Sequence, residues 1–106
     1  MAQRTNSETV KKHVSIYLAH FDIGEQDIIT CEVCGKQGRV DSGGFDIHHV
    51  VFRSRGGKDE IKNLMCLCRT PQGKGCHDKA HSEEYKEGEL KLIHGYFMAG
   101  VRKRFK

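Results

Sequence analysis

The chain has 106 residues, of which 37% are hydrophobic, 8% aromatic and 30% charged. A chain of this length forms one domain with a modest core, because a small domain buries only about 65% of its unfolded surface. The formal net charge of +4 and the pI of about 8.9 favour a polyanionic partner. No apolar run approaches the ~20 residues that span a bilayer and the N-terminus does not resemble a signal peptide, so we expect a cytoplasmic, intracellular protein.

An N-terminal helix is predicted from Ser7 to about Phe21. His13 and His20 lie on this helix, and the pattern gives neither of them a functional role. The apolar residues follow the 3.6-residue period of one helix face. They are Val10, Val14, Tyr17, Leu18 and Phe21.

Two cysteines separated by two residues, Cys31 and Cys34, are followed by Gly35. One tight turn directs both thiolates at a single ion, and Gly35 suits the positive φ that such a turn usually requires. Alone, this motif is weak evidence and also fits a redox pair, but the βαβ context of a redox pair is missing. Zinc is favoured if two more ligands follow.

Three further cysteines do follow, at Cys66, Cys68 and Cys76. We favour Cys68 and Cys76 as the remaining ligands of a closed, four-thiolate zinc site, because Leu64 and Leu67 have the character of core residues that precede it. Cys66 in place of Cys68 is the alternative. An odd number of cysteines in an intracellular chain favours metal ligation over disulfides, and such a site supplies folding free energy that a small core lacks.

Between the two cysteine groups, residues 38–52 resemble a hairpin. Arg39 and Val40 form one arm, residues 41–44 the turn and residues 45–52 the other arm. A basic, glycine-rich segment follows, whose alternative interpretation is a solvated loop. Its candidate contacts to DNA phosphates are Arg53, Arg55 and Lys58.

Four histidines fall on the second arm and on a helix predicted from Cys76 to Tyr85. His77 and His81 are four residues apart on that helix, which is the spacing that one metal needs from two imidazoles. Neighbouring side chains of a strand point to opposite faces, so His48 and His49 share a pocket only if the strand ends, bulges or twists there.

Asp46 shares the strand face of His48 and is the fallback metal ligand, with a surface carboxylate as the alternative interpretation. The segment from Glu87 predicts a short packing helix, which Gly95 and Gly100 weaken. The basic residues 102–106 form either a frayed end or a DNA-facing arm.

In order, spacing and residue type, this pattern resembles the HNH endonucleases of the ββα-metal type, in their small, zinc-stabilised phage and bacterial form. Those domains show Cys-x-x-Cys, an acidic residue or His followed by His, an Asn, and Cys-x-x-Cys-His. Two departures concern the second cysteine pair, which encloses seven residues, and His81, which matches only some members such as colicin nucleases. The counterparts here are Cys31, Cys34, His48, His49, Asn63, Cys68, Cys76 and His77.

The resemblance implies an α+β fold, in which a ββα-metal core with a four-cysteine zinc site is flanked by N-terminal and C-terminal helices. The single domain would then comprise an N-terminal helical part at residues 1–27, the core at 28–84 and a C-terminal packing segment with a basic tail at 85–106. The implied partner is double-stranded DNA, without a membrane, and phage packaging proteins or a second copy of the chain are further candidates.

The implied activity is metal-dependent hydrolysis of DNA phosphodiester bonds, by nicking or double-strand cleavage, to leave 5′-phosphate and 3′-hydroxyl ends. His49 would be the general base, and Asn63 would brace the loop that carries it. His48, His77 and His81 would hold one catalytic divalent ion, which is Mg, Mn, Ni or Zn. The alternatives are a non-catalytic, zinc-stabilised nucleic-acid-binding module and a purely structural zinc protein.

Overall fold

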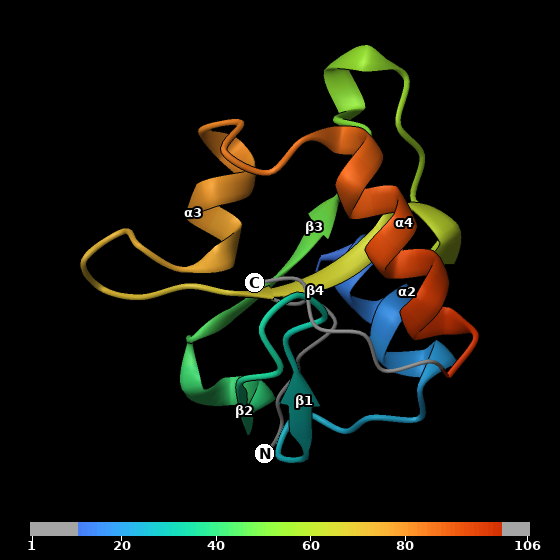
Figure 1. Ribbon diagram of the computed structural model, residues 1–106. Helices are drawn as coiled ribbons and strands as arrows, with labels where there is room; N and C mark the ends of the chain where they lie inside the picture. The colour runs from blue at the N-terminus through green and yellow to red at the C-terminus, as the bar shows by residue number, and fades with distance from the viewer. Residues whose placement is uncertain (1–10, 101–106) are drawn as a thin grey trace.

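The computed structural model describes residues 11–100, in which one helix is followed by four short strands and then by two further helices (Figure 1). Three short 3-10 turns lie at Val40–Ser42, Arg53–Arg55 and Ile61–Asn63. The longer elements, in chain order, are helix α2 (Lys12–His20), strands β1 (Ile28–Thr30), β2 (Gln37–Arg39), β3 (Phe45–His49) and β4 (Leu64–Cys68), and helices α3 (Cys76–His81) and α4 (Glu87–Met98).

Strand β4 occupies the centre of the domain, and all five of its residues are buried. It pairs with β3 in an antiparallel register that places His48 opposite Met65. Side chains alternate along a strand, so Leu64 and Cys66 pack in the core beside α2, whereas Met65 and Leu67 pack in the core beside α3 and α4. Figure 1 shows β3 and β4 crossing the middle of the molecule, with the three helices around them and β1 and β2 to one side.

The predicted hairpin of residues 38–52 is wrong. Arg39 pairs with Ile28 in the β1–β2 ribbon, and β3 pairs with β4 instead. The physical reason is burial: β2 is largely exposed, whereas β4 offers a fully buried partner to the half-buried strand β3. Strand β3 also ends at His49 and does not continue to Phe52.

The predicted helices are present, with different ends. The N-terminal helix is confirmed as α2, and the first predicted positions, 7–10, lie outside the described residues. Helix α3 ends at His81 and does not reach Tyr85, because Glu83 has a φ of 66°, a left-handed conformation that a right-handed helix cannot continue. Helix α4 continues through Gly95, and the basic residues 102–106 lie outside the described residues.

A buried polar network around Glu32, which is 5% exposed, joins distant parts of the chain. The Tyr17 hydroxyl donates to Oε2 of Glu32 at 2.6 Å, and the backbone N–H of Cys66 donates to the same oxygen at 3.3 Å. His94 Nδ1 lies 2.7 Å from Oε1 of Glu32, and His94 Nε2 donates to the carbonyl of Ile61 at 2.7 Å. The network therefore ties α2, the β1–β2 turn, β4 and α4 to one another.

Replacing His94 by Ala should lower the free energy of unfolding by about 3–5 kcal/mol, because it leaves a buried carboxylate without its partner. Burial lowers the pKa of His94, but the hydrogen bond and charge of Glu32 outweigh burial and raise this pKa above its ordinary value. Protonated His94 therefore contributes its full stabilisation below about pH 6.5, the ordinary pKa of histidine, and loses it as the pH rises through its raised pKa in the folded protein. The penalty of His94→Ala should accordingly shrink at alkaline pH.

Urea unfolding at neutral and alkaline pH measures this penalty. The matched control is His20→Ala, since His20 is exposed on α2, and it should change stability by less than about 0.5 kcal/mol. Equal stability of the His94→Ala and His20→Ala proteins would show that the network contributes nothing.

Among residues 11–100, no helix combines the length and the apolar character needed to cross a membrane.

Candidate metal centres

Four cysteines converge where the β1–β2 turn, the end of β4 and the start of α3 meet. The sulfurs of Cys31, Cys34, Cys68 and Cys76 all lie within 4.8 Å of one another. The Sγ atoms of Cys34 and Cys68 are 3.7 Å apart, close to the separation of about 3.8 Å that two thiolates have around a tetrahedral zinc ion. A disulfide would need about 2.05 Å, so Cys34 and Cys68 are not joined by one. This donor set fits a metal ion of the zinc type.

The β1–β2 turn holds the first cysteine pair by its backbone. The N–H of Cys31 donates to the carbonyl of Lys36 at 2.8 Å, and the N–H of Gly35 donates to the carbonyl of Cys31 at 3.0 Å. Gly35 has a φ of 82°, so the expectation of a positive φ at this glycine is confirmed. The hydrogen bond between the thiols of Cys31 and Cys76 lowers the pKa of Cys31 to about 5 and raises the pKa of Cys76 well above its ordinary value, so Cys31 ionises before Cys76.

The second cysteine pair is brought together across its long loop by a close backbone approach. A Cβ on Gly75 would lie 2.4 Å from the Cα of Arg69, so only glycine fits where α3 meets the end of β4. The N–H of Cys76 then lies 3.5 Å from the Sγ of Cys68. Cys66 is outside the cluster, and its burial raises the pKa of its thiol well above the ordinary value. Cys68, and not Cys66, completes the set of four.

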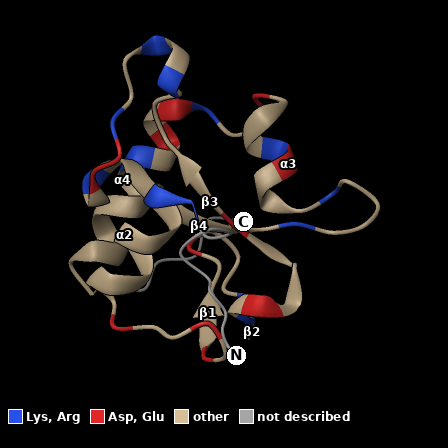
Figure 2. Cartoon of the chain, turned by 180° about the vertical axis from the view of Figure 1, so that it is seen from behind, with Lys and Arg blue, Asp and Glu red and all other residues tan. Residues whose placement is uncertain are grey.

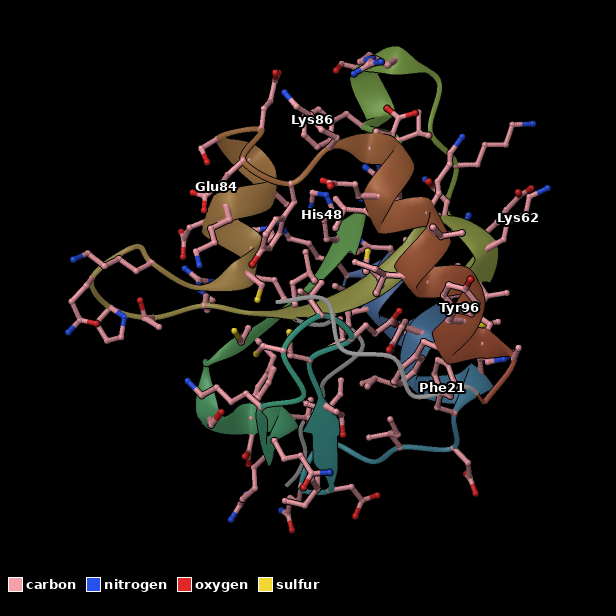
Figure 3. The ribbon with its side chains drawn as sticks, viewed as in Figure 1. Phe21, His48, Lys62, Glu84, Lys86 and Tyr96 are labelled. Atoms are coloured by element: carbon pink, nitrogen blue, oxygen red, sulfur yellow. The ribbon has the colours of Figure 1, made fainter. Side chains whose placement is uncertain are left out.

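Three histidines form a separate cluster between β3 and α3. The ring nitrogens of His48, His77 and His81 lie within 4.8 Å of one another, and the Nε2 atoms of His77 and His81 are 3.1 Å apart. Two imidazole nitrogens bound to one tetrahedral ion are about 3.3 Å apart. The cluster therefore fits one ion with three protein ligands and one open position. Figure 3 shows His48 in the space between α3 and α4.

Two members of the cluster, His48 and His77, have a lowered pKa that favours the neutral imidazole a metal site requires. Burial, followed by the neighbouring His77 and His81, lowers the pKa of His48 to about 3. Burial also lowers the pKa of His77, although the Asp46 carboxylate acts in the opposite direction. Neutral imidazoles bind metal ions, so His48 and His77 are available as ligands at neutral pH.

Asp46 contacts the histidine cluster through His77 and does not belong to the set of converging ligands. Its Oδ2 lies 3.2 Å from His77 Nδ1 and 2.9 Å from the guanidinium of Arg69. A carboxylate that accepts the Nδ1–H of a histidine fixes the ring and leaves Nε2 for the ion. The residue expected as a fallback ligand therefore lies against a candidate ligand, outside the converging set.

We expect Asp46→Ala to weaken binding of Ni²⁺ at the three-histidine cluster by about 10- to 100-fold, because His77 would lose the partner that orients its ring. Calorimetric titration of the purified protein with Ni²⁺ measures the affinity. The control is Asp41→Ala, which removes an exposed carboxylate that pairs with Arg39. If both variants bound Ni²⁺ as the wild type does, Asp46 would have no orienting role.

His49 turns to a different set of neighbours from His48. Its Nε2 lies 2.7 Å from Oδ1 of Asp59, and its ring centroid is 4.6 Å from that of His13. The hydrogen bond with His49 is the main cause that lowers the pKa of Asp59, so the carboxylate is ionised and only accepts. In the neutral ring, Nε2 therefore carries the proton and Nδ1 is the acceptor.

The structure resolves the difficulty of two adjacent histidines on one strand, because β3 ends at His49. His48, His49, His77 and His81 all line one cleft of about 290 Å³. The strand was expected to run to residue 52 and is shorter than that. Its end at His49 nevertheless lies where two adjacent histidines need it in order to share a pocket. A potential proton acceptor thus lies on the same cleft as a potential three-histidine metal site.

Asn63 holds the loop that connects the two strands. Its Oδ1 accepts from the N–H of Val51 at 2.8 Å, and its Nδ2 donates to the carbonyls of Val51 and Lys58, each at 3.1 Å. Its own backbone carbonyl accepts from the N–H of Val50 at 2.9 Å. Because Asp59 follows Lys58 in the chain, Asn63 also holds the backbone next to the residue that contacts His49.

A family model described as HNH endonuclease matches residues 31–83, which is half of the chain. The match contains all the residues of the four-cysteine cluster and of the three-histidine cluster. The chain belongs to the HNH endonuclease family. Neither the comparison with curated proteins nor the comparison with solved structures gave a match.

The basic loop of this HNH protein projects from the domain beside the cleft. Figure 2 shows its Lys and Arg positions on the segment between β3 and β4. The side chains of Arg53 and Arg55 are 62% and 64% exposed, although they pair with Asp59 and Glu87 respectively. Lys58 is also exposed. All three remain available to a polyanion.

Sequence reasoning about this HNH chain missed two neighbours of His49. Asp59 belongs to no periodic pattern. It lies next to His49 because the loop that Asn63 holds folds back towards the end of β3. His13 lies on α2, outside the matched segment, and was given no role. A helical histidine carries no signal of its own, because its partner lies on a strand more than thirty residues away.

Proposed function

We propose that this HNH protein is a metal-dependent DNA endonuclease with β3, β4 and α3 as a ββα-metal core. It hydrolyses phosphodiester bonds of double-stranded DNA and leaves 5′-phosphate and 3′-hydroxyl ends. The observation that carries the proposal is the convergence of His48, His77 and His81 within 4.8 Å, beside His49 on the same cleft. Membership of the HNH family supports it at the level of nuclease activity.

His48, His77 and His81 would hold the catalytic ion, and their imidazoles favour Zn, Ni or Mn over Mg, which prefers oxygen ligands. Such an ion, when bound, neutralises charge on the phosphoryl oxygens and on the leaving oxygen. The three rings hold their positions through protein contacts. Phe52 stacks on His81 with ring centroids 5.4 Å apart and meets the edge of His48 at 5.7 Å.

His49 acts as the general base through Nδ1. As the oxygen of a water molecule bonds to phosphorus, Nδ1 takes a proton from that water. The bond between phosphorus and the 3′ oxygen breaks, and the 3′ oxygen takes a proton from solvent. The ionised carboxylate of Asp59, at 2.7 Å from Nε2, stabilises the imidazolium that results.

Three further elements of the chain complete the proposed machinery. Asn63 braces the loop after His49, and the basic side chains of that loop contact DNA phosphates. The four cysteines hold a zinc ion that stabilises the small core. The proposed phosphate contacts are Arg53, Arg55 and Lys58.

Supercoiled plasmid provides the test. Incubation of the purified protein with plasmid and Mg²⁺, Mn²⁺, Ni²⁺ or Zn²⁺ should produce nicked or linear DNA with at least one of these ions, and EDTA should abolish cleavage. A His48→Ala, His77→Ala double variant should be inactive. Plasmid that is bound but not cut with every ion would instead indicate a non-catalytic nucleic-acid-binding module. Ligation of the products without prior treatment would verify the 5′-phosphate ends.

A further inference from the structure

A second convergence of metal-ligating groups lies beside the proposed catalytic site. His13 comes from α2, His49 from the end of β3, and Asp59 from the loop that follows. One ring nitrogen of each histidine and one carboxylate oxygen lie within 4.8 Å of one another. The three side chains are partly buried, and those of His49 and Asp59 are only 13% and 15% exposed.

The Nδ1 atom of His13 is buried, and within residues 11–100 it has no hydrogen-bond partner. Leaving a buried polar atom unpaired costs about 1–3 kcal/mol, so this position is unfavourable for a side chain that only packs. A cation coordinated by that nitrogen would supply the missing partner. Two imidazoles and one carboxylate form a ligand set that suits Zn²⁺ and similar ions.

Two neighbouring cations limit the affinity of this cluster. Arg53 contacts both carboxylate oxygens of Asp59, at 2.9 and 3.2 Å, and Lys11 lines the same cleft. The Arg53 side chain is 62% exposed, so it can keep its shorter contact with Oδ2 while Oδ1 faces the histidines. An ion at this cluster should therefore bind more weakly than one at the three-histidine cluster, where the neighbouring Arg69 pairs with Asp46 and not with one of the three ligands.

We propose that His13, His49 and Asp59 form a second divalent-cation site, of lower affinity than the three-histidine cluster, and that an ion bound there inhibits cleavage. The binding site stands on the geometry alone. The inhibition rests on the proposed function, because it requires His49 to be the general base.

The inhibition follows from the chemistry of an imidazole with two nitrogens. An ion bound at Nε2 takes the position of the proton that the Asp59 carboxylate accepts. The neutral ring then carries its one proton at Nδ1, so Nδ1 cannot accept a proton from water. An ion at Nδ1 occupies the lone pair that would accept a proton from water. In both cases His49 has no free acceptor nitrogen, whichever of its nitrogens binds the ion.

Calorimetric titration with Zn²⁺ tests the site without any measurement of activity. Protein that already carries zinc at its four cysteines should bind two further ions, one tightly and one weakly. His13→Gln, which keeps a helix-forming side chain of similar size, should weaken the second event by at least about tenfold while the first is unchanged. His20→Gln, on the exposed surface of the same helix, should bind both ions as the wild type does.

A wild type that binds only one further ion would overturn the proposal, and so would a His13→Gln variant that binds the second ion with unchanged affinity. Circular dichroism of each variant ensures that folded proteins are compared, and Asp59→Asn provides a second variant if His13→Gln does not fold. Loss of the weak event in Asp59→Asn supports the site, and its retention contradicts it.

Cleavage of plasmid across a range of Zn²⁺ concentrations tests the inhibition. With a supporting ion present, the wild-type rate should fall as the weak site fills, and in His13→Gln this fall should move to at least about tenfold higher Zn²⁺. An unmoved inhibition curve would contradict the inhibitory role. If two ions bind but no ion supports cleavage, the nuclease proposal fails and the second site stands.

Discussion

His49→Ala is expected to lower the rate of plasmid cleavage by about 10²- to 10⁴-fold, which is the usual contribution of a positioned general base. The variant should keep its fold and its ion at His48, His77 and His81, because His49 contacts His13 and Asp59 instead of those ligands. Initial rates at saturating metal, compared with Ni²⁺ affinity from titration, separate the loss of the base from a loss of metal.

The control for this prediction is His20→Ala, which removes an exposed histidine of α2 and should cleave at the wild-type rate. A rate for His49→Ala within tenfold of the wild type would remove His49 from its proposed role. A parallel loss of rate and of Ni²⁺ affinity would mean that His49 acts on the metal site and not on water.

Cys31→Ser should release zinc and unfold much of the domain. Structural zinc sites of this kind contribute about 10–16 kcal/mol of apparent binding free energy, and a whole domain is stable by only about 5–15 kcal/mol. A serine hydroxyl is a poor substitute for a thiolate ligand. Zinc content after gel filtration and thermal unfolding by circular dichroism measure the two effects.

Cys66→Ser is the matched control, since Cys66 is buried in the middle of β4, two residues before Cys68, but lies outside the four-cysteine cluster. It should retain zinc and lose only the modest stability that a polar substitution in the core costs. A Cys31→Ser protein with an unchanged melting temperature would refute the structural zinc site.

The sequence was most informative where the chemistry is local. Cys31 and Cys34 share one turn, and His77 and His81 share one helix face, so their spacing indicated that the members of each pair lie close together, as they do. The HNH family, suspected from the order of these residues, is confirmed by the match to residues 31–83. The roles proposed for the individual site residues stay predictions.

The sequence was least informative where a partner comes from far along the chain. Strand β3 was paired with the wrong segment, because burial of β4 by both core clusters decides the pairing and no local signal reports it. Asp59 and His13 were missed for the same reason. The Glu32–His94 pair joins residues 62 positions apart and has no spacing rule that could reveal it.

The position of Glu32 between Cys31 and Cys34 has a consequence for degradation of the protein. The carboxylate that anchors α2 and α4 is carried by the turn that the metal would hold. Removal of zinc by a chelator should therefore release both helices together with the turn, and expose their backbones to proteases in a single cooperative opening. Metal supply would then set the lifetime of the whole domain, and not only its capacity to cut.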